Sequence, residues 1–322
     1  MRRTVFVSLL SLFIFIGLPC ELKAESYPSR PVKIIVPYPA GGIVDVSTRI
    51  VTDWITADWG QPIVVENRPG ANGNIGANAV RNASADGYTL LIGSTFLVTN
   101  PLLDHQSRIS DKALVPIGTI GVPPNFLVVP AASSARQLQD IVALARARPG
   151  EVSATNPGIG SSNHLGTELF QSLAGIEFNQ IGYKGQPPFI PDLLANRVDF
   201  AFASAALVSN HLRDGKLRAL AVSHEKRLKS HPDVPTVGEA GYPQAVVLPW
   251  TGLFAPAGTP DAVLDRLTVE LKKALQSPEV IRRYEAMEAV NPDLFRDDFS
   301  RFLTAEDQRW RRVLNERNIK AE

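Results

Sequence analysis

The sequence predicts an α/β protein built as two lobes that face each other across a cleft. Runs of β-branched residues alternate with stretches of helical periodicity along most of the 322 residues, a pattern typical of helices layered on mainly parallel sheets. Short apolar segments at residues 126–130 and 250–256 separate blocks of this alternation and are interpreted as crossings between lobes. The length also favours two domains. Closure of two hinged lobes is a way to trap a ligand.

The N-terminus has the pattern of a removed secretory signal. A short basic start is followed by an apolar run from Val5 to Leu18, which is short of the about 20 residues that a spanning helix needs. We place the cleavage after Ala24, which makes residues 1–24 a signal peptide and predicts a periplasmic location. A lipoprotein would be acylated at Cys20, but the preceding proline stands where a small residue is wanted, and this favours ordinary cleavage.

Removal of the signal changes the composition. It takes away the only cysteine, so no disulfide is expected. It also removes three basic residues and one acidic residue, which changes the net charge from +1 to −1. A charge near zero without basic clusters argues against nucleic acid as a partner.

The elements are predicted in three blocks. The first lobe begins in residues 25–125, the second lobe occupies 126–249, and 250–322 returns to the first lobe and is mainly helical. Strands are expected at residues 32–37, 62–66, 89–92, 126–130, 152–155, 178–183, 198–203 and 219–222. Helices are expected after the first two strands and at 136–147, 164–174 and 187–196.

Four loops rich in glycine, serine and threonine follow strand ends and precede helices, at residues 39–45, 93–96, 156–164 and 183–186. In open α/β sheets ligands bind outside the carboxyl ends of the strands. Helix N-termini there present amide groups to an anion, and hydroxyl groups can donate to a carboxylate. The four loops together predict a site for a small carboxylate, although each loop alone could be only a turn.

Catalytic and metal-binding interpretations are weaker. Ser162 and His164 allow a serine hydrolase as an alternative, but the G-x-S-x-G elbow needs glycine at the position of His164. The remaining histidines lack metal-ligand spacing, and Gly70, Gly73 and Gly76 are not spaced as in the dinucleotide fingerprint. The sequence predicts a protein that is not an enzyme and has no cofactor.

Three motifs carry a resemblance to a known family. Residues 31–42 (PVKIIVPYPAGG), 64–76 (VVENRPGANGNIG) and 85–91 (ADGYTLL) resemble successive motifs of the Bug receptors of tripartite tricarboxylate transporters. Further matches follow in order at residues 156–164, 183–185, 215–222, 232–236 and 255–260. The resemblance therefore covers nearly all of the chain after the signal.

This resemblance implies a type II periplasmic binding protein fold, in which two Rossmann-like lobes enclose the ligand. It implies a monomeric receptor that holds a carboxylate by amides, hydroxyls and waters and delivers it to integral-membrane permease subunits. The candidate ligand-binding residues that it gives are Tyr38, Gly41, Gly42, Asp45, Ser94, Thr95, Gly160, Ser161, Ser162, His164, Tyr183, Lys184 and Gly185. Asp45 is interpreted as mainly structural because it also fits a helix cap beside Arg49.

Two departures from the family pattern bear on the ligand. After residues 198–202 the family often has an aspartate that can bind an amino group, whereas Ser204 stands near this strand end here. Ser204 is therefore a further candidate, and an amino-acid ligand is disfavoured. The segment 106–113 is unlike the family and is expected to alter the cleft rim. The predicted function is capture of a small mono- or dicarboxylate, aliphatic or aromatic. A periplasmic sensor with the same pocket is the alternative.

Overall fold

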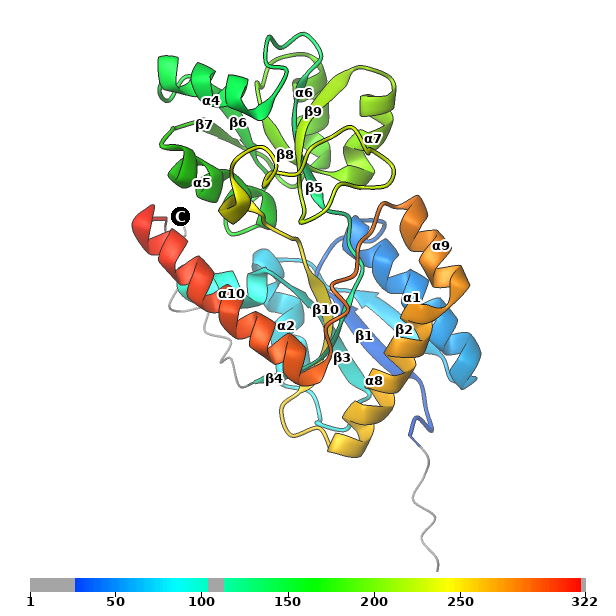
Figure 1. Cartoon of the computed structure of the whole chain (residues 1–322). Coiled ribbons are helices and arrows are strands. Elements are labelled where there is room, and N and C mark those ends of the chain that lie inside the picture. Colours follow the sequence, from blue (N-terminus) through cyan, green and yellow to red (C-terminus); the bar gives the residue numbers. More distant parts are fainter. Residues whose placement is uncertain (1–26, 104–112, 320–322) are drawn as a thin grey trace, which may run out of the picture.

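The computed structural model describes residues 27–103 and 113–319 and has two lobes, one above the other in Figure 1. The predicted signal peptide with Cys20, and residues 106–112 of the unusual segment, lie outside the described residues. Within the described ranges, no helix is both long enough and apolar enough to cross a membrane. The α/β fold of two lobes that the sequence predicts is confirmed.

Lobe 1 contains a five-stranded sheet in the order β2-β1-β3-β10-β4. Its strands are β1 (Val32–Val36), β2 (Ile63–Asn67), β3 (Thr89–Ser94), β4 (Leu114–Ile120) and β10 (Thr251–Pro256). Strand β1 is parallel to β2 and β3, whereas β10 runs antiparallel between β3 and β4. The helices are α1 (Ile43–Trp59), α2 (Asn74–Arg81), α3 (Phe96–Leu103), α8 (Asp261–Gln276), α9 (Pro278–Ala286) and α10 (Arg296–Glu316).

Lobe 2 repeats this strand order with other strands. Its strands are β5 (Asn125–Pro130), β6 (Ser153–Asn156), β7 (Asn179–Gly182), β8 (Ala201–Ser204) and β9 (Leu217–Ser223). A three-stranded sheet β8-β5-β9 and a parallel pair β6-β7 are joined by a bridge between Ala154 and Phe200. The helices are α4 (Leu138–Ala147), α5 (Ser162–Ala174), α6 (Ile190–Leu194) and α7 (Ala205–Arg213).

The crossings between the lobes continue directly into the middle of each sheet. Residues 121–124 join β4 to β5, which lies between β8 and β9, and residues 246–250 lead into β10. A third segment, between α9 and α10, runs beside the first crossing through a bridge of Val290 to Val122. These three segments form the hinge region. The residue limits that the sequence gives for the lobes stay a prediction.

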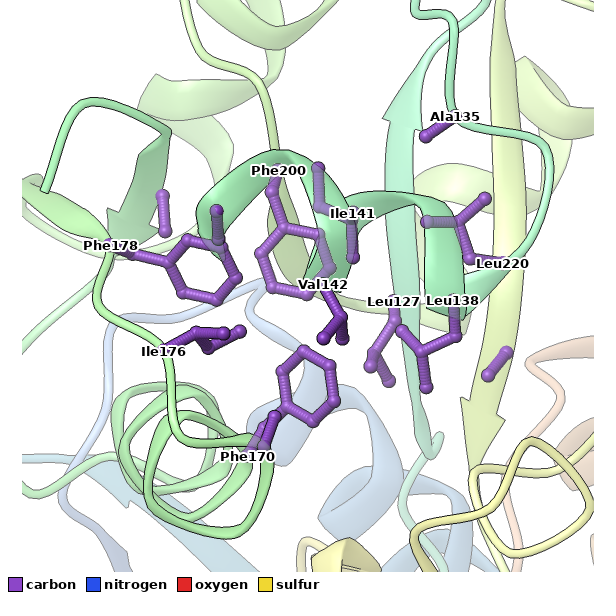
Figure 2. Close-up of a cluster of buried hydrophobic side chains, with 14 of the residues drawn as sticks. Leu127, Ala135, Leu138, Ile141, Val142, Phe170, Ile176, Phe178, Phe200 and Leu220 are labelled. Atoms are coloured by element: carbon purple, nitrogen blue, oxygen red, sulfur yellow. The ribbon is translucent and has the colours of Figure 1, made fainter. Parts of the chain in front are cut away.

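An aromatic cluster forms the core of lobe 2 (Figure 2). The ring of Phe170 on α5 lies 6.1 Å from that of Phe200 and 6.3 Å from that of Phe178. Helix α5 is delimited by Ser161, whose side chain caps its first turn, and by Gly175 in the left-handed conformation. Burial of each such aromatic side chain stabilises the fold by roughly 1.5–3 kcal/mol. The core thereby fixes the direction in which the N-terminus of α5 points.

A separate cluster joins the lobes. Leu165 and Leu169 on α5 are buried in the same cluster as residues of lobe 1, which include Phe96, Trp250 and Trp310. The lobes are therefore in contact along one side of α5.

Candidate ligand-binding cleft

The four candidate loops all lie at the edges where the two lobes meet. In lobe 1 they follow the carboxyl ends of β1 and β3, and in lobe 2 those of β6 and β7. The loop edges touch directly, because the hydroxyl of Thr99 on α3 donates to the carbonyl of Gly160 at 3.2 Å. The structure therefore brings loops that are distant in sequence to one junction, as the strand-end rule predicts.

Asp45 organises the first loop. Its carboxylate, 2% exposed, accepts hydrogen bonds from the amide of Gly41 at 2.9 Å, the Nε of Arg49 at 3.0 Å and the Nδ2 of Asn67 at 2.9 Å. Burial alone would raise its pKa, but these hydrogen bonds outweigh burial and hold the pKa of Asp45 below its usual value. Asp45 thus links the Gly41 turn to the end of β2, and both of its carboxylate oxygens accept hydrogen bonds from lobe 1.

Tyr38 and Ser94 meet across the ends of β1 and β3. Their hydroxyl oxygens are 2.5 Å apart, and the ring of Tyr38 packs edge-on against Phe96. Burial raises the pKa of Tyr38, with the Ser94 hydrogen bond opposing it. The neighbouring Thr95 is buried at the start of α3, where its carbonyl accepts the amide of Thr99 at 3.0 Å. Gly42 begins α1. These groups present neutral donors at the edge of lobe 1.

Gly160 lies at a contact between the lobes, where its carbonyl accepts the hydroxyl of Thr99. It is buried with φ +77°, and a Cβ there would stand 2.7 Å from the Cδ1 of Leu103 in lobe 1. A side chain would therefore meet both backbone strain and a neighbouring lobe. The next residue, Ser161, accepts the amide of His164 at 3.2 Å and caps α5, with Ser162 as the first helical residue.

His164 is directed into the protein. Its Nδ1 accepts the amide of Gly160 at 3.3 Å, and its Nε2 lies 3.8 Å from Glu168. Burial lowers the pKa of His164, with the charge of Glu168 opposing the shift. The ring is therefore neutral near pH 7 with its proton on Nε2, and both nitrogens face groups of lobe 2. This geometry does not make His164 a base for Ser162.

In the second candidate loop of lobe 2, at residues 183–186, some residues bond within lobe 2 and others face the solvent. The hydroxyl of Tyr183 donates to Asp192 at 3.0 Å, so it is used within lobe 2. Lys184 is exposed. Gly185 has φ +92°, and its amide donates to the carbonyl of Pro157 at 3.1 Å. This bond joins the 183–186 loop to the 156–164 loop.

A largely buried polar network lies at these two loops, and Ser204 is its only member that the sequence gives as a single candidate residue. Asn163 donates to the Oδ1 of Asn125 at 3.1 Å and accepts from Gln186 at 3.2 Å. Gln186 in turn accepts the amide of Ser204 at 2.8 Å. The Oγ of Ser204 and the Nδ2 of Asn125 are buried without a hydrogen-bond partner. The position of Gln186 directly after Gly185 is the sequence signal that could have identified it.

The helix N-termini at the junction favour an anion. Helices α1 and α7 begin at this edge without a side-chain cap, and α5 begins there with Ser161. Each N-terminus carries about half a positive charge. Among the described residues no group of three or more metal-ligating side chains is present.

Comparison with known proteins places the chain in a family. Residues 47–319 match the TctC family, described as "Tripartite tricarboxylate transporter family receptor". The chain belongs to this receptor family. The resemblance seen in the sequence motifs is thus confirmed, and the protein is a periplasmic solute-binding receptor and not an enzyme.

Individual relatives of the receptor cover nearly its whole length. Protein BugT of Bordetella pertussis, strain Tohama I, is 37% identical over 99% of both chains. The structure of an R. palustris protein with adipate is 31% identical with a TM-score of 0.82, over 91% of this chain and 99% of the other. MatC of Rhodopseudomonas palustris with bound malate is 27% identical with a TM-score of 0.77, over 89% of this chain and 100% of the other.

Proposed function

We propose that this receptor captures a short aliphatic dicarboxylate, in the size range of malate and adipate, between its two lobes. The observation that carries the proposal is the pair of unpartnered buried groups, Ser204 Oγ and Asn125 Nδ2, beneath loops that present helix N-termini. Buried polar groups without partners are rare in native proteins. A ligand oxygen bound at this point would supply the missing partner. Two relatives of the same fold hold dicarboxylates.

Neutral donors suit a receptor that must both hold and release its ligand. A carboxylate that accepts amide and hydroxyl hydrogen bonds away from water gains charge-assisted bonds of roughly 1.5–3 kcal/mol each. The loss of a few such bonds on opening therefore lowers affinity by orders of magnitude. No buried cation has to be desolvated in this cycle.

The same residues argue against an amino group on the ligand. A ligand ammonium needs an uncompensated carboxylate. Asp45, the carboxylate among the candidate residues, already binds Arg49, Asn67 and Gly41. Ser204 offers a neutral hydroxyl on β8. We therefore expect discrimination between a dicarboxylate and its 2-amino analogue.

Delivery to integral-membrane permease subunits is the second part of the proposal. Membership of a tripartite transporter receptor family supports it. Thr99 and Gly160 are in contact between the lobes. The surface around this contact forms only when the lobes meet, so we expect the permease to bind the closed receptor there.

The test is a thermal-shift panel on residues 25–322, stripped of ligand by unfolding and refolding. Succinate, malate and adipate are compared with aspartate and with the uncharged diamide of succinate. A dicarboxylate at about 100 times its dissociation constant adds roughly 2.7 kcal/mol to stability and raises the melting temperature by a few degrees. A flat response to all dicarboxylates, or an equal response to the diamide, would contradict the proposal.

A further inference from the structure

The end of the last helix of lobe 1 reaches lobe 2. Figure 1 shows the C-terminal end of α10 beside α5. There the Nε of Arg317 donates to the Oε2 of Glu168 on α5 at 3.0 Å. The side chain of Arg317 is 27% exposed and that of Glu168 is 10% exposed. This ion pair between lobes is better shielded from solvent than an ordinary surface pair.

Glu168 is also connected to the candidate ligand loop. Its Oε1 lies 3.8 Å from the Nε2 of His164 and accepts from Gln180. The Nδ1 of His164 accepts the amide of Gly160. One continuous set of contacts therefore leads from Arg317 in lobe 1 to the backbone of Gly160.

Helix α10 has a second attachment, close to the hinge region. Arg309 donates to the carbonyl of Gln244, just before the second crossing, and to that of Val246, its first residue. Eight residues of helix rise by about 12 Å, so Arg317 is farther along α10 than the attachment near the crossing. A rotation of the lobes about the crossings displaces the distant contact more than the near one. Opening is thus expected to separate Arg317 from Glu168 first.

We propose that Arg317 and Glu168 form a latch between the lobes, and that His164 transmits its state to the Gly160 loop. The proposal rests on the proposed ligand site at that loop. The three side chains are positioning residues, since their contacts are with the protein itself. Closure pairs Glu168 with Arg317 and leaves His164 neutral, so that Nδ1 holds the Gly160 amide in place.

Opening changes the electrostatics of His164. The charged groups that face it are Glu168 on its own helix and, through Glu168, Arg317 from α10. Without Arg317 the carboxylate of Glu168 acts on the imidazole alone and favours its protonation. A protonated imidazole has no acceptor for the Gly160 amide. The latch therefore couples lobe closure to the shape of the ligand loop.

The experiment measures the lobes directly. Residues 25–322 contain no cysteine, so Arg81→Cys on α2 and Ala143→Cys on α4, both exposed positions, give one spin label on each lobe. Distance distributions are recorded without ligand for this background and with Arg317→Ala, Arg317→Lys or Arg311→Ala added. Arg311 is the matched control because it pairs with Asp307 within α10.

We expect Arg317→Ala to shift the distribution toward long distances and to weaken binding of the best dicarboxylate about five- to tenfold. Arg317→Lys should keep part of the short-distance population and part of the affinity. Arg311→Ala should change neither the distances nor the affinity. We also expect Arg317→Ala to raise the pH at which His164 is half protonated, as followed by NMR. The distance measurement needs no ligand, so it tests the latch even if the receptor bound no dicarboxylate.

The latch is overturned if Arg317→Ala and Arg311→Ala give the same distances and affinities. It is also overturned if Arg317→Ala lowers the melting temperature while leaving distances, affinity and the His164 titration unchanged. That result would make the ion pair a stabilising contact only.

Discussion

The lobe 1 edge and the lobe 2 edge of the candidate site differ in how their polar groups are hydrogen-bonded. At the lobe 1 edge, Asp45 has three donors and Tyr38 is paired with Ser94. At the lobe 2 edge, Ser204 and Asn125 keep buried polar atoms without partners. Both edges are built on sheets of the same strand order, so the difference lies in the side chains and not in the topology.

This difference indicates that the two edges have different roles in stability and in ligand binding. A satisfied network is rigid and costs stability when one member is removed. An unpartnered buried group costs stability in the empty protein, and this cost is offset when a ligand provides the partner. We therefore expect lobe 1 to supply a rigid frame and lobe 2 to supply polar groups that gain their partners from the proposed ligand. Substitutions on the two edges should then separate stability from affinity.

The largest effect is expected where the edges touch. Gly160→Val places a β-branched side chain at φ +77° and against Leu103, so we expect ligand affinity to fall by at least about 100-fold, or roughly 2.7 kcal/mol. The control is Gly215→Val, which has φ +67° and no atom within 4 Å of a Cβ. Calorimetric titration that gave both variants the same affinity would contradict the contact between the edges.

The next effect tests the frame of lobe 1. Asp45→Asn removes the charge that three donors share, and we expect the free energy of unfolding to fall by about 2 kcal/mol. Asp53→Asn, on the same helix, removes a carboxylate whose side chain is 63% exposed, and should cost less than about 1 kcal/mol. Urea unfolding of both variants gives the comparison. Equal losses would mean that Asp45 does not organise this edge.

A smaller effect should appear on the lobe 2 edge, and in affinity instead of stability. Ser204→Ala removes a buried hydroxyl that has no hydrogen-bond partner in the protein, so we expect about fivefold weaker dicarboxylate binding with an equal or slightly higher melting temperature. Ser223→Ala is the matched control, because Ser223 bonds both the amide and the carbonyl of Val247. It should lower the melting temperature without changing affinity. The reverse pattern would remove Ser204 from the site.

The smallest effect is a pH dependence from His164. Its pKa is lowered in the folded protein by burial, so the unfolded chain binds the proton more readily. The free energy of unfolding should then fall as the pH drops below about 6.5 toward the lower folded pKa. A His164→Gln variant should lose this dependence. An identical pH profile in both proteins would show that another group is responsible.

Most of the fold follows from local patterns, and the exceptions have physical reasons. Strand β5 and helices α4 and α5 lie within two residues of their predicted limits. Strand β4 was not predicted because Pro116 and Gly118 weaken its strand pattern. Helix α3 was missed because it is apolar on all sides and contains Pro101.

The candidate site, too, could be predicted only in part from the sequence. The strand-end rule brings Gly160 and Thr95 to one junction, because backbone topology alone decides where loops emerge. The hydrogen bonds that join Asn125, Asn163 and Gln186 could not be predicted, although Asn163 and Gln186 stand in predicted loops. It depends on the register that sets Asn125 opposite Ser204 and on side-chain directions, which composition and spacing do not encode.

The insertion of β10 between β3 and β4 has a consequence for the order in which the chain folds. The strands of lobe 2 come from one continuous stretch that ends with Ser223. The sheet of lobe 1 stays interrupted until residues 251–256 arrive, because β4 joins it only through β10. A chain that emerges N-terminus first therefore completes its second lobe before its first. The lobe that begins the sequence is the last to close its hydrogen-bond ladder.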